Sequence, residues 1–379
     1  MITKYIIAGT ILSGTVIGAG MFVLPHIFFS AGLLKGFAYL LLFGVLTTLI
    51  HLMYAEVVLR TSEKHELSGY TRVYLGSTMG NITKVTQIIG ITGSLVAYQV
   101  LGAGFVRLII PSLSFLDASF IFFVLASIGV LAETSWLAQG ELVSNGLLFV
   151  LVGYFFLVGL PHWRVLSWDV KGNMFMSTYG IVLYALIGYQ AVREVIEYLR
   201  KEHVPITPFP FVLGSFFSVV LSGFFVVALL LLYRGTDPPL TVFTGLGVGS
   251  LILTIGGVLG GINMLDSFWT VGTYLRNVFV NDIGLYPRVG LVFTLGLPLL
   301  GGVLLQQRLL ELLSVVGGVF FGFELLVILF LWRAARNGVR GTFESPAFSL
   351  PISSFLFWFL AALLSGGVLY SLCSLFSFL

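Results

Sequence analysis

The sequence predicts an all-α membrane protein with eleven transmembrane helices. Hydrophobic residues make up 58% of the 379-residue chain and charged residues only 9%, whereas a soluble domain is about 25% charged. The chain contains apolar runs long enough to cross a bilayer, which takes about 20 residues in a helix. These runs do not alternate with a period of two, so helices are favoured over a β-barrel.

The first five spans are predicted in the N-terminal part of the chain. The first apolar run extends well beyond the roughly 7–15 residues of a signal-peptide core, so we expect it to stay in the membrane as an uncleaved span. The connection from Arg60 to Lys84 has mixed charges and predicts a solvated loop or a short interfacial helix. The five predicted spans are Tyr5–Phe29, Gly36–Leu59, Val85–Pro111, Ser119–Trp136 and Val143–Leu160.

Six more spans follow a polar segment, Pro161–Asn173, whose two tryptophans suit the level of the lipid headgroups. The eighth span is long enough to be tilted or to begin as a helix outside the membrane. No connection is large enough for a separate soluble domain, so residues 1–379 are expected to form one transmembrane domain. The six predicted spans are Met174–Leu199, Phe209–Tyr233, Leu246–Val280, Val289–Leu305, Leu309–Trp332 and Ile352–Phe376.

The distribution of Lys and Arg orients the chain. With the N-terminus in the cytoplasm, thirteen basic residues fall in cytoplasmic segments and five in external ones. Cytoplasmic loops are enriched in Lys and Arg, so this bias predicts a multi-pass protein of the plasma membrane with its N-terminus inside and its C-terminus outside. The net charge of +3 is small and dispersed, which gives no indication of nucleic-acid binding. The single cysteine, Cys373, allows no intramolecular disulfide.

A glycine-rich stretch, GTVIGAGMFVLP at residues 14–25, lies in the first span. It lacks the third glycine of a dinucleotide-binding fingerprint, and no carboxylate precedes Glu56. Glycines at mid-span can serve close helix packing, but they also weaken the helical hydrogen-bond ladder, as does Pro25. Unwound backbone at membrane depth persists only where it lines a cavity. We therefore expect an interrupted helix at a binding site.

The sixth span carries a related but weaker pattern. Its centre, LYALIGYQ at residues 183–190, places Gly188 and Gln190 at mid-depth. Transporters built from inverted repeats bind substrate where discontinuous helices of the two repeats meet. A second interruption is therefore predicted within Ala185–Gln190, five spans after the first.

These motifs carry a family resemblance. GTVIGAGMFVLP resembles the first-span motif of the amino acid–polyamine–organocation superfamily, nearest its aromatic and hydroxy amino-acid permeases and the amino acid/auxin permeases. YALIGYQAVREV, at residues 184–195, is similar to the sixth-span motif, and MYAEVVLR, at residues 53–60, resembles the acid-bearing end of the second span. The resemblance implies a leucine-transporter-like fold that works by alternating access. It would have two inverted five-helix repeats, about residues 5–160 and 174–332, plus an accessory helix at about 352–376.

The same features predict how a small zwitterion would bind. Freed N–H groups and the N-terminus of a half-helix can hold a carboxylate, while freed carbonyl groups can hold an ammonium group. In the resembled fold the third span lines the pocket opposite the breaks, which implies contact between Tyr98 and the substrate. The predicted substrate-binding residues are Thr15, Gly18, Ala19, Gly20, Met21, Tyr98, Tyr184, Ile187, Gly188 and Tyr189.

Asp266 is an ionisable residue well inside the eighth span. A carboxylate at mid-bilayer costs about 2.5–3.5 kcal/mol on insertion scales, so it requires a partner, a cavity or a proton. The resembled family has adjacent hydroxyl residues here, which face a sodium site or its relic at the first break, whereas this chain has Asp266 and Ser267. The acid favours coupling to protons; sodium coupling and a purely structural carboxylate are the alternatives. The predicted ion-coupling residues are Val16, Asp266 and Ser267.

Other charged residues have less specific interpretations. Glu324, inside the tenth span, requires either a partner within the bundle or a role in a second proton relay. Lys4 precedes the first span and Asp282 follows the eighth. The resembled fold brings these two ends together at the cytoplasmic mouth, which implies a Lys4–Asp282 gate. Glu56 and Arg60, four residues apart, are expected to form a surface pair.

The sequence therefore predicts an ion-coupled symporter of neutral amino acids, aromatic ones included. No enzyme activity, resident metal or other cofactor is expected beyond the co-transported proton or sodium ion, and no P-loop motif indicates ATP-driven pumping. Three rival classes stay open: a substrate sensor that binds without transport, a channel, and a membrane-embedded enzyme, which would need a positioned base beside its nucleophile. The particular amino acid and the oligomeric state do not follow from the sequence.

Overall fold

The computed structural model describes residues 1–132, 137–165, 178–233, 249–338 and 346–378. All regular elements in these ranges are helical. The first half contains α1 (Ile2–Val16), α2 (Ala19–Ala31), α3 (Leu33–Arg60), α4 (Leu67–Leu75), α5 (Ser77–Ile109), α6 (Phe115–Ala132), α7 (Leu137–Gly159) and η1 (Leu160–Val165). The second half contains α8 (Tyr179–Leu186), η2 (Tyr189–Ala191), α9 (Val192–Lys201), α10 (Phe209–Leu232), α11 (Ser250–Asn277), η3 (Val278–Asp282), α12 (Pro287–Leu305), η4 (Gln306–Arg308), α13 (Leu309–Val315), η5 (Val316–Phe321), α14 (Gly322–Asn337) and α15 (Ser354–Phe378).

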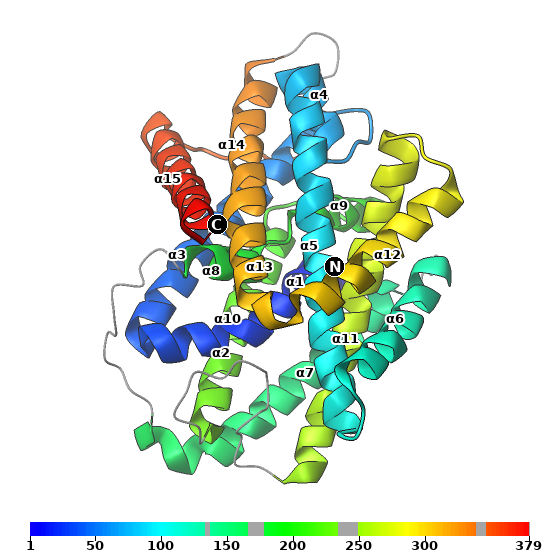
Figure 1. Cartoon of the computed structure of the whole chain (residues 1–379). Coiled ribbons are helices and arrows are strands. Elements are labelled where there is room, and N and C mark those ends of the chain that lie inside the picture. The colour runs from blue at the N-terminus through cyan, green and yellow to red at the C-terminus, as the bar shows by residue number, and fades with distance from the viewer. Residues whose placement is uncertain (133–136, 166–177, 234–248, 339–345, 379) are drawn as a thin grey trace.

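Long apolar helices account for most of the described chain. Seven helical segments are long and apolar enough to cross a membrane, and the bent pair α1–α2 makes an eighth. One of the seven runs without a gap from Pro287 to Asn337, and Figure 1 shows its parts α12 and α14 pointing in different directions. The chain is an all-helical membrane protein with about seven or eight apolar helices, and the total of eleven spans stays a prediction.

Each predicted span contains described helix, although several ends differ. α5 begins at Ser77, earlier than the predicted Val85, and runs through the centre of the molecule (Figure 1). The predicted connection from Arg60 to Lys84 contains the short helix α4, whose Leu67, Tyr70 and Thr71 are buried. Parts of the fourth, sixth and eighth predicted spans, namely residues 133–136, 174–177 and 246–248, lie outside the described residues.

The first predicted interruption is confirmed. α1 ends at Val16, α2 begins at Ala19, and the two helices are bent by 63°. Ile17 (φ −80°, ψ 79°) and Gly18 (φ −129°, ψ −148°) have left the helical conformation. The break therefore lies in the second half of the glycine-rich stretch, since Gly14 is still part of α1.

The second interruption is also confirmed. α8 ends at Leu186, and Ile187 is extended, with φ −79° and ψ 138°. A single 3₁₀ turn, η2, then leads into α9. The break falls within the predicted segment Ala185–Gln190.

Glycines bring the two breaks into contact. A Cβ atom placed on Gly20 would lie 2.3 Å from the Cα atom of Ala185, and one on Gly188 would lie 2.4 Å from a methyl carbon of Val16. No real side chain fits at these distances. The start of α2 therefore meets the end of α8, and the end of α1 meets the second break, only because both positions lack a side chain.

Replacing Gly20 with Ala is expected to destabilise the protein by about 1–3 kcal/mol, because the added methyl group overpacks the contact with α8. Gly296→Ala in α12 is the matched control, since a Cβ atom there meets nothing within 4 Å and Ala favours the helix. Thermal unfolding in detergent should show a lower midpoint for Gly20→Ala and an unchanged or higher one for the control. Equal midpoints for the two variants would contradict the close packing.

Candidate functional site

A small cavity lies between the two breaks. Its volume is about 20 Å³, and a water molecule needs at least about 10–15 Å³. This conformation is thus closed around the site, which must widen to admit a larger ligand. The described residues that line the cavity are Thr15, Val16, Gly18, Ala19, Gly20, Ile91, Ser94, Tyr98, Tyr184, Ile187, Gln190, Val271 and Phe321.

Backbone groups at the two breaks give the site its polarity. No side chain caps the N-terminus of α2, and the first N–H groups of a helix have no intrahelical acceptor. The N–H of Met21 already donates to the Gly18 carbonyl at 3.2 Å, which leaves Ala19 and Gly20 as donors. The last carbonyl groups of α8 lack intrahelical donors for the same reason. A partly positive helix end and a partly negative one therefore meet here.

Aromatic and hydroxyl side chains from α5 and α8 close one side of the cavity. A Cβ atom on Gly18 would lie 3.1 Å from the Tyr98 hydroxyl oxygen, so this tyrosine lies directly against the first break. The Tyr184 hydroxyl is buried and interacts with the hydroxyl groups of Tyr98 and Ser94, although neither contact in the described chain has the geometry of a full hydrogen bond. Phe321 stacks on the Tyr184 ring, with centroids 5.8 Å apart. None of the described lining residues is charged.

Most of the predicted substrate-binding residues lie at this cavity. Met21, Gly188 and Tyr189 are not among the lining residues, so their contact with the substrate stays a prediction. The Met21 N–H is already used, Gly188 packs on Val16, and the Tyr189 hydroxyl is turned toward α14, where it donates to Glu324. The predicted residues that do line the cavity are Thr15, Gly18, Ala19, Gly20, Tyr98, Tyr184 and Ile187.

The predicted site did not include several wall residues, and for some of them only tertiary packing brings the side chain to the breaks. Phe321 comes from the π-helix η5 and Val271 from α11, far along the chain. Ser94 had a local signal, since it lies one helical turn before Tyr98 on the same face. The remaining two are Ile91 and Gln190.

The predicted ion-coupling residues divide into two groups. Val16 lines the cavity, and the Ser267 hydroxyl lies 3.5 Å from where a Gly18 Cβ atom would be. Asp266, the next residue on α11, is only 9% exposed but does not line the cavity. Within the described residues its carboxyl group forms no hydrogen bond or ion pair. It is thus a buried acid next to Ser267 on α11, without the partner that a structural carboxylate would have.

Glu56 shows how this bundle holds a structural acid. One carboxylate oxygen lies 2.7 Å from Arg60 and accepts a hydrogen bond from Ser349 at 2.8 Å. The other accepts from the Trp332 indole at 2.7 Å and from the Leu350 N–H at 3.0 Å. The predicted pair with Arg60 exists, but Glu56 is fully buried rather than at the surface, and it ties α3 to α14 and to the segment before α15.

Lys4 contacts an acid other than the predicted one. Its ammonium group lies 2.9 Å from the carboxylate of Glu202, and the Tyr5 hydroxyl donates to the Pro205 carbonyl at 2.8 Å. The hydrogen bond and the charge of Lys4 lower the pKa of Glu202. These contacts join the start of α1 to the segment after α9. The side chain of Asp282 lies outside the described part of the structure, so a Lys4–Asp282 gate stays a prediction.

A second small cavity, of about 10 Å³, adjoins the first on the α9 side. It shares Thr15, Gln190 and Val271 with the first cavity. Its other lining includes Glu194 and Tyr274. The carboxylate of Glu194 therefore lies next to the uncharged central cavity, on the side of α9.

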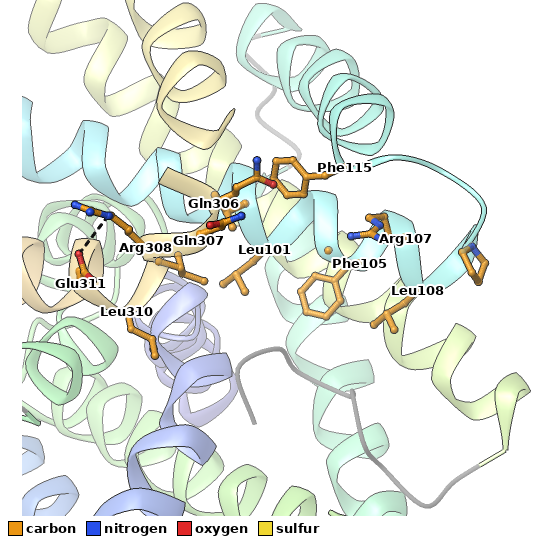
Figure 2. A pocket seen from close by; sticks show the side chains of 14 residues that line it. Leu101, Phe105, Arg107, Leu108, Phe115, Gln306, Gln307, Arg308, Leu310 and Glu311 are labelled. Atoms are coloured by element: carbon orange, nitrogen blue, oxygen red, sulfur yellow. Dashed lines mark ion pairs between the residues drawn. The ribbon is translucent and has the colours of Figure 1, made fainter. Parts of the chain in front are cut away.

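A much larger cavity, of about 800 Å³, lies further along α5 (Figure 2). Leu101, one helical turn after Tyr98, is in its wall, together with Phe105 and Arg107. Figure 2 shows the Arg308–Glu311 ion pair, 3.9 Å apart, at the other side of this cavity from Arg107. The cavity does not include the unpaired backbone of either break, so the small central cavity is the better candidate for specific binding.

Comparisons with known proteins place the chain among transporters. A comparison with curated protein sequences found no match. The structure is similar to a manganese transporter from Eremococcus coleocola in complex with an aromatic bis-isothiourea substituted compound, with a TM-score of 0.69 and 13% identity over 98% of this chain and 86% of that one. Two mutants of the manganese transporter give TM-scores of 0.63 at 11% identity, over 99% of this chain and 95% of theirs. These identities support likeness of fold alone.

The sequence itself matches a family model over residues 1–230, which is more than half of the chain. The matched part includes both broken helices and Tyr98. The chain belongs to the tryptophan/tyrosine permease family.

Proposed function

We propose that the protein is an ion-coupled symporter of neutral aromatic amino acids, with protons favoured over sodium. The family and the structural neighbours indicate a transporter rather than an enzyme. The observation that carries the proposal is the meeting of two broken helices at an uncharged cavity with an aromatic wall. The proposal includes eleven spans in a leucine-transporter-like arrangement in the cell membrane, with the N-terminus in the cytoplasm and the C-terminus outside.

Backbone groups would hold the amino acid at its charged ends. The free N–H groups of Ala19 and Gly20 would bind the carboxylate, and the terminal carbonyl groups of α8 would bind the ammonium group. The side chain would lie against Tyr98, Tyr184 and Phe321. The buried, unpaired Tyr184 hydroxyl supports a polar contact with the ligand, because leaving such a group unsatisfied costs about 1–3 kcal/mol.

The neutral lining argues against a divalent metal ion as the substrate, despite the manganese transporters of similar fold. Hard cations require several oxygen ligands, typically with carboxylates among them. Across the described ranges no group of three or more His, Cys, Asp and Glu side chains could hold a metal ion. A zwitterion bound by two helix ends needs no charged side chain.

The arrangement of the three cavities supports alternating access. The central site is closed, the large cavity begins one turn beyond Tyr98 on α5, and the Glu194 cavity adjoins the site on the other side. We propose that the large cavity is the external approach and that the α9 side is the cytoplasmic exit. Lys4 and Glu202 would then stabilise the closed cytoplasmic side, although an exposed pair contributes at most about 1 kcal/mol.

Asp266 would bind the coupled proton near the first break. A buried carboxylate without a counter-charge is costly, and protonation removes that charge. Sodium is the alternative, because Ser267 and the carbonyl groups of the first break offer oxygen ligands. The position of Asp266 outside the cavity lining favours the proton.

Uptake in proteoliposomes tests the proposed function. We expect counterflow of tryptophan or tyrosine, accumulation under an inward proton gradient, and no accumulation under a sodium gradient alone. Alanine, lysine and manganese ions serve as competitors that should compete poorly for a site with an aromatic, uncharged wall. Binding in detergent without counterflow would instead indicate a sensor, and flux that never saturates would indicate a channel.

Tyr184→Phe separates a ligand contact from a packing effect. Removing a buried, unpaired hydroxyl should leave stability unchanged or raise it, while the KM for the aromatic amino acid rises about tenfold, as expected for about 1.4 kcal/mol of lost binding. Tyr179→Phe is the matched control, because the Tyr179 hydroxyl is also buried and unpaired but does not line the cavity. An equal KM for both variants would show that the Tyr184 hydroxyl does not contact the substrate.

Asp266→Asn tests the coupling residue. The variant cannot release a proton from this position, so accumulation should fall about tenfold for each pH unit of gradient, while counterflow, which needs no gradient, remains. Ser267→Ala is the comparison for sodium, because it removes an oxygen ligand but no titratable group. Unchanged proton-driven accumulation by Asp266→Asn would show that the coupled proton binds elsewhere.

A further inference from the structure

Glu324 is a second buried acid, and its surroundings differ from those of Glu56. It lies in the first turn of α14, just after the π-helix η5, and is fully buried. The Tyr189 hydroxyl donates to one carboxylate oxygen, and the other oxygen has no hydrogen-bond partner among the described residues. No Lys, Arg or His of the described chain pairs with it. The ionised form is therefore uncompensated, which costs several kcal/mol in a protein interior.

Tyrosines are the titratable groups that face Glu324. Tyr189 comes from η2 and Tyr274, which interacts with Glu324 electrostatically, from α11. Tyr54 of α3 packs edge-on against the Tyr189 ring, with centroids 5.9 Å apart. None of these groups carries a positive charge that could compensate a carboxylate.

No charged group on the remaining neighbouring elements of the described chain acts on the ionisation of Glu324. The ion pair of Arg193 with Glu66 acts on Tyr54 rather than on Glu324. The η5 sequence, VGGVFF, has no titratable residue. On α15, the titratable side chains Tyr370 and Cys373 are exposed.

Polar side chains lead from the cavity at α9 to Glu324. Tyr274 lines that cavity, and its hydroxyl accepts a hydrogen bond from the Gln87 amide at 2.8 Å. Gln87 also interacts with the Tyr189 hydroxyl, which in turn donates to Glu324. Polar side chains therefore connect the lining of the α9 cavity to a carboxyl group that is otherwise enclosed in the bundle.

We propose that Glu324 is a second proton-binding site, which controls the position of the second broken helix through Tyr189. When Glu324 is ionised, Tyr189 donates a charge-assisted hydrogen bond, which is about twice as strong as a neutral one, and η2 is held against α14. When a proton occupies the carboxyl group, this bond weakens and the second break can move. The proton binds to a carboxylate lone pair and leaves again as the same ion. The inference rests on the proposed function and assigns one acid to each break, Asp266 to the first and Glu324 to the second.

Glu324→Gln in proteoliposomes tests the inference. Each coupled proton contributes a factor of about ten in accumulation for each pH unit of gradient. The variant should therefore accumulate about tenfold less tryptophan or tyrosine than the wild type at a gradient of one unit, with counterflow retained. Tyr189→Phe keeps the acid but removes its link to the break, so it should lower accumulation and change the pH dependence of counterflow. Accumulation by Glu324→Gln equal to that of the wild type would overturn the inference.

The outcomes distinguish this inference from the proposed function. A wild-type protein without counterflow would reject the proposed function. Loss of coupling in Asp266→Asn together with normal coupling in Glu324→Gln would leave the function standing and reject the role of Glu324.

A wild-type measurement covers the case in which Glu324→Gln fails to fold. Dicyclohexylcarbodiimide reacts with protonated carboxyl groups in apolar surroundings, and mass spectrometry locates the adduct. We expect labelling at Glu324 that declines as the pH rises, and no labelling at Glu56, whose oxygens are fully hydrogen-bonded. The reagent is added during turnover, because Glu324 is enclosed in the described conformation. Labelling of Asp266 but not of Glu324 at any pH would then overturn the inference.

Discussion

The contact between two interrupted helices is the constraint on which the rest of the structure depends. Lipid offers no hydrogen bonds, so unwound backbone in a membrane must face protein or a polar cavity. Gly20 against Ala185 and Gly188 against Val16 bring the two breaks close enough to share one cavity. The same contact sets the helix ends that would bind a zwitterion, so fold and candidate site have one physical origin.

Charge is kept next to the site and not in it. The described lining of the central cavity is neutral, while Asp266 and Glu324 lie buried nearby, each without a positive partner. Glu56, with hydrogen bonds to both oxygens, shows that the bundle can satisfy an acid fully where the role is structural. The contrast supports the proposed division of roles, in which neutral groups would recognise the amino acid and uncompensated acids would respond to protons.

Local signals predicted the fold well, and tertiary packing decided the details of the site. Both breaks were predictable because glycine and a polar amide disfavour a regular membrane helix at the positions that they occupy. The direction of Tyr189 was not, because the single 3₁₀ turn of η2 rotates it away from the cavity and toward α14. Phe321 reaches the site because it lies in a π-helix, which the hydrophobic periodicity of the sequence does not predict. The partner of Lys4 depends on how the segment after α9 folds back, which the sequence pattern does not encode.

Two lines of support for the function come from different parts of the chain. The family match ends at residue 230 and so includes the broken helices and Tyr98, but neither Asp266 nor Glu324. Substrate class is thus supported by sequence likeness, whereas proton coupling rests on the burial and isolation of the two acids. The manganese transporter at 13% identity shares the fold alone, so it gives no information about the cargo of this chain. The fold supplies the paired helix breaks, and under the proposed function the side chains around them would determine what is carried and which ion drives transport.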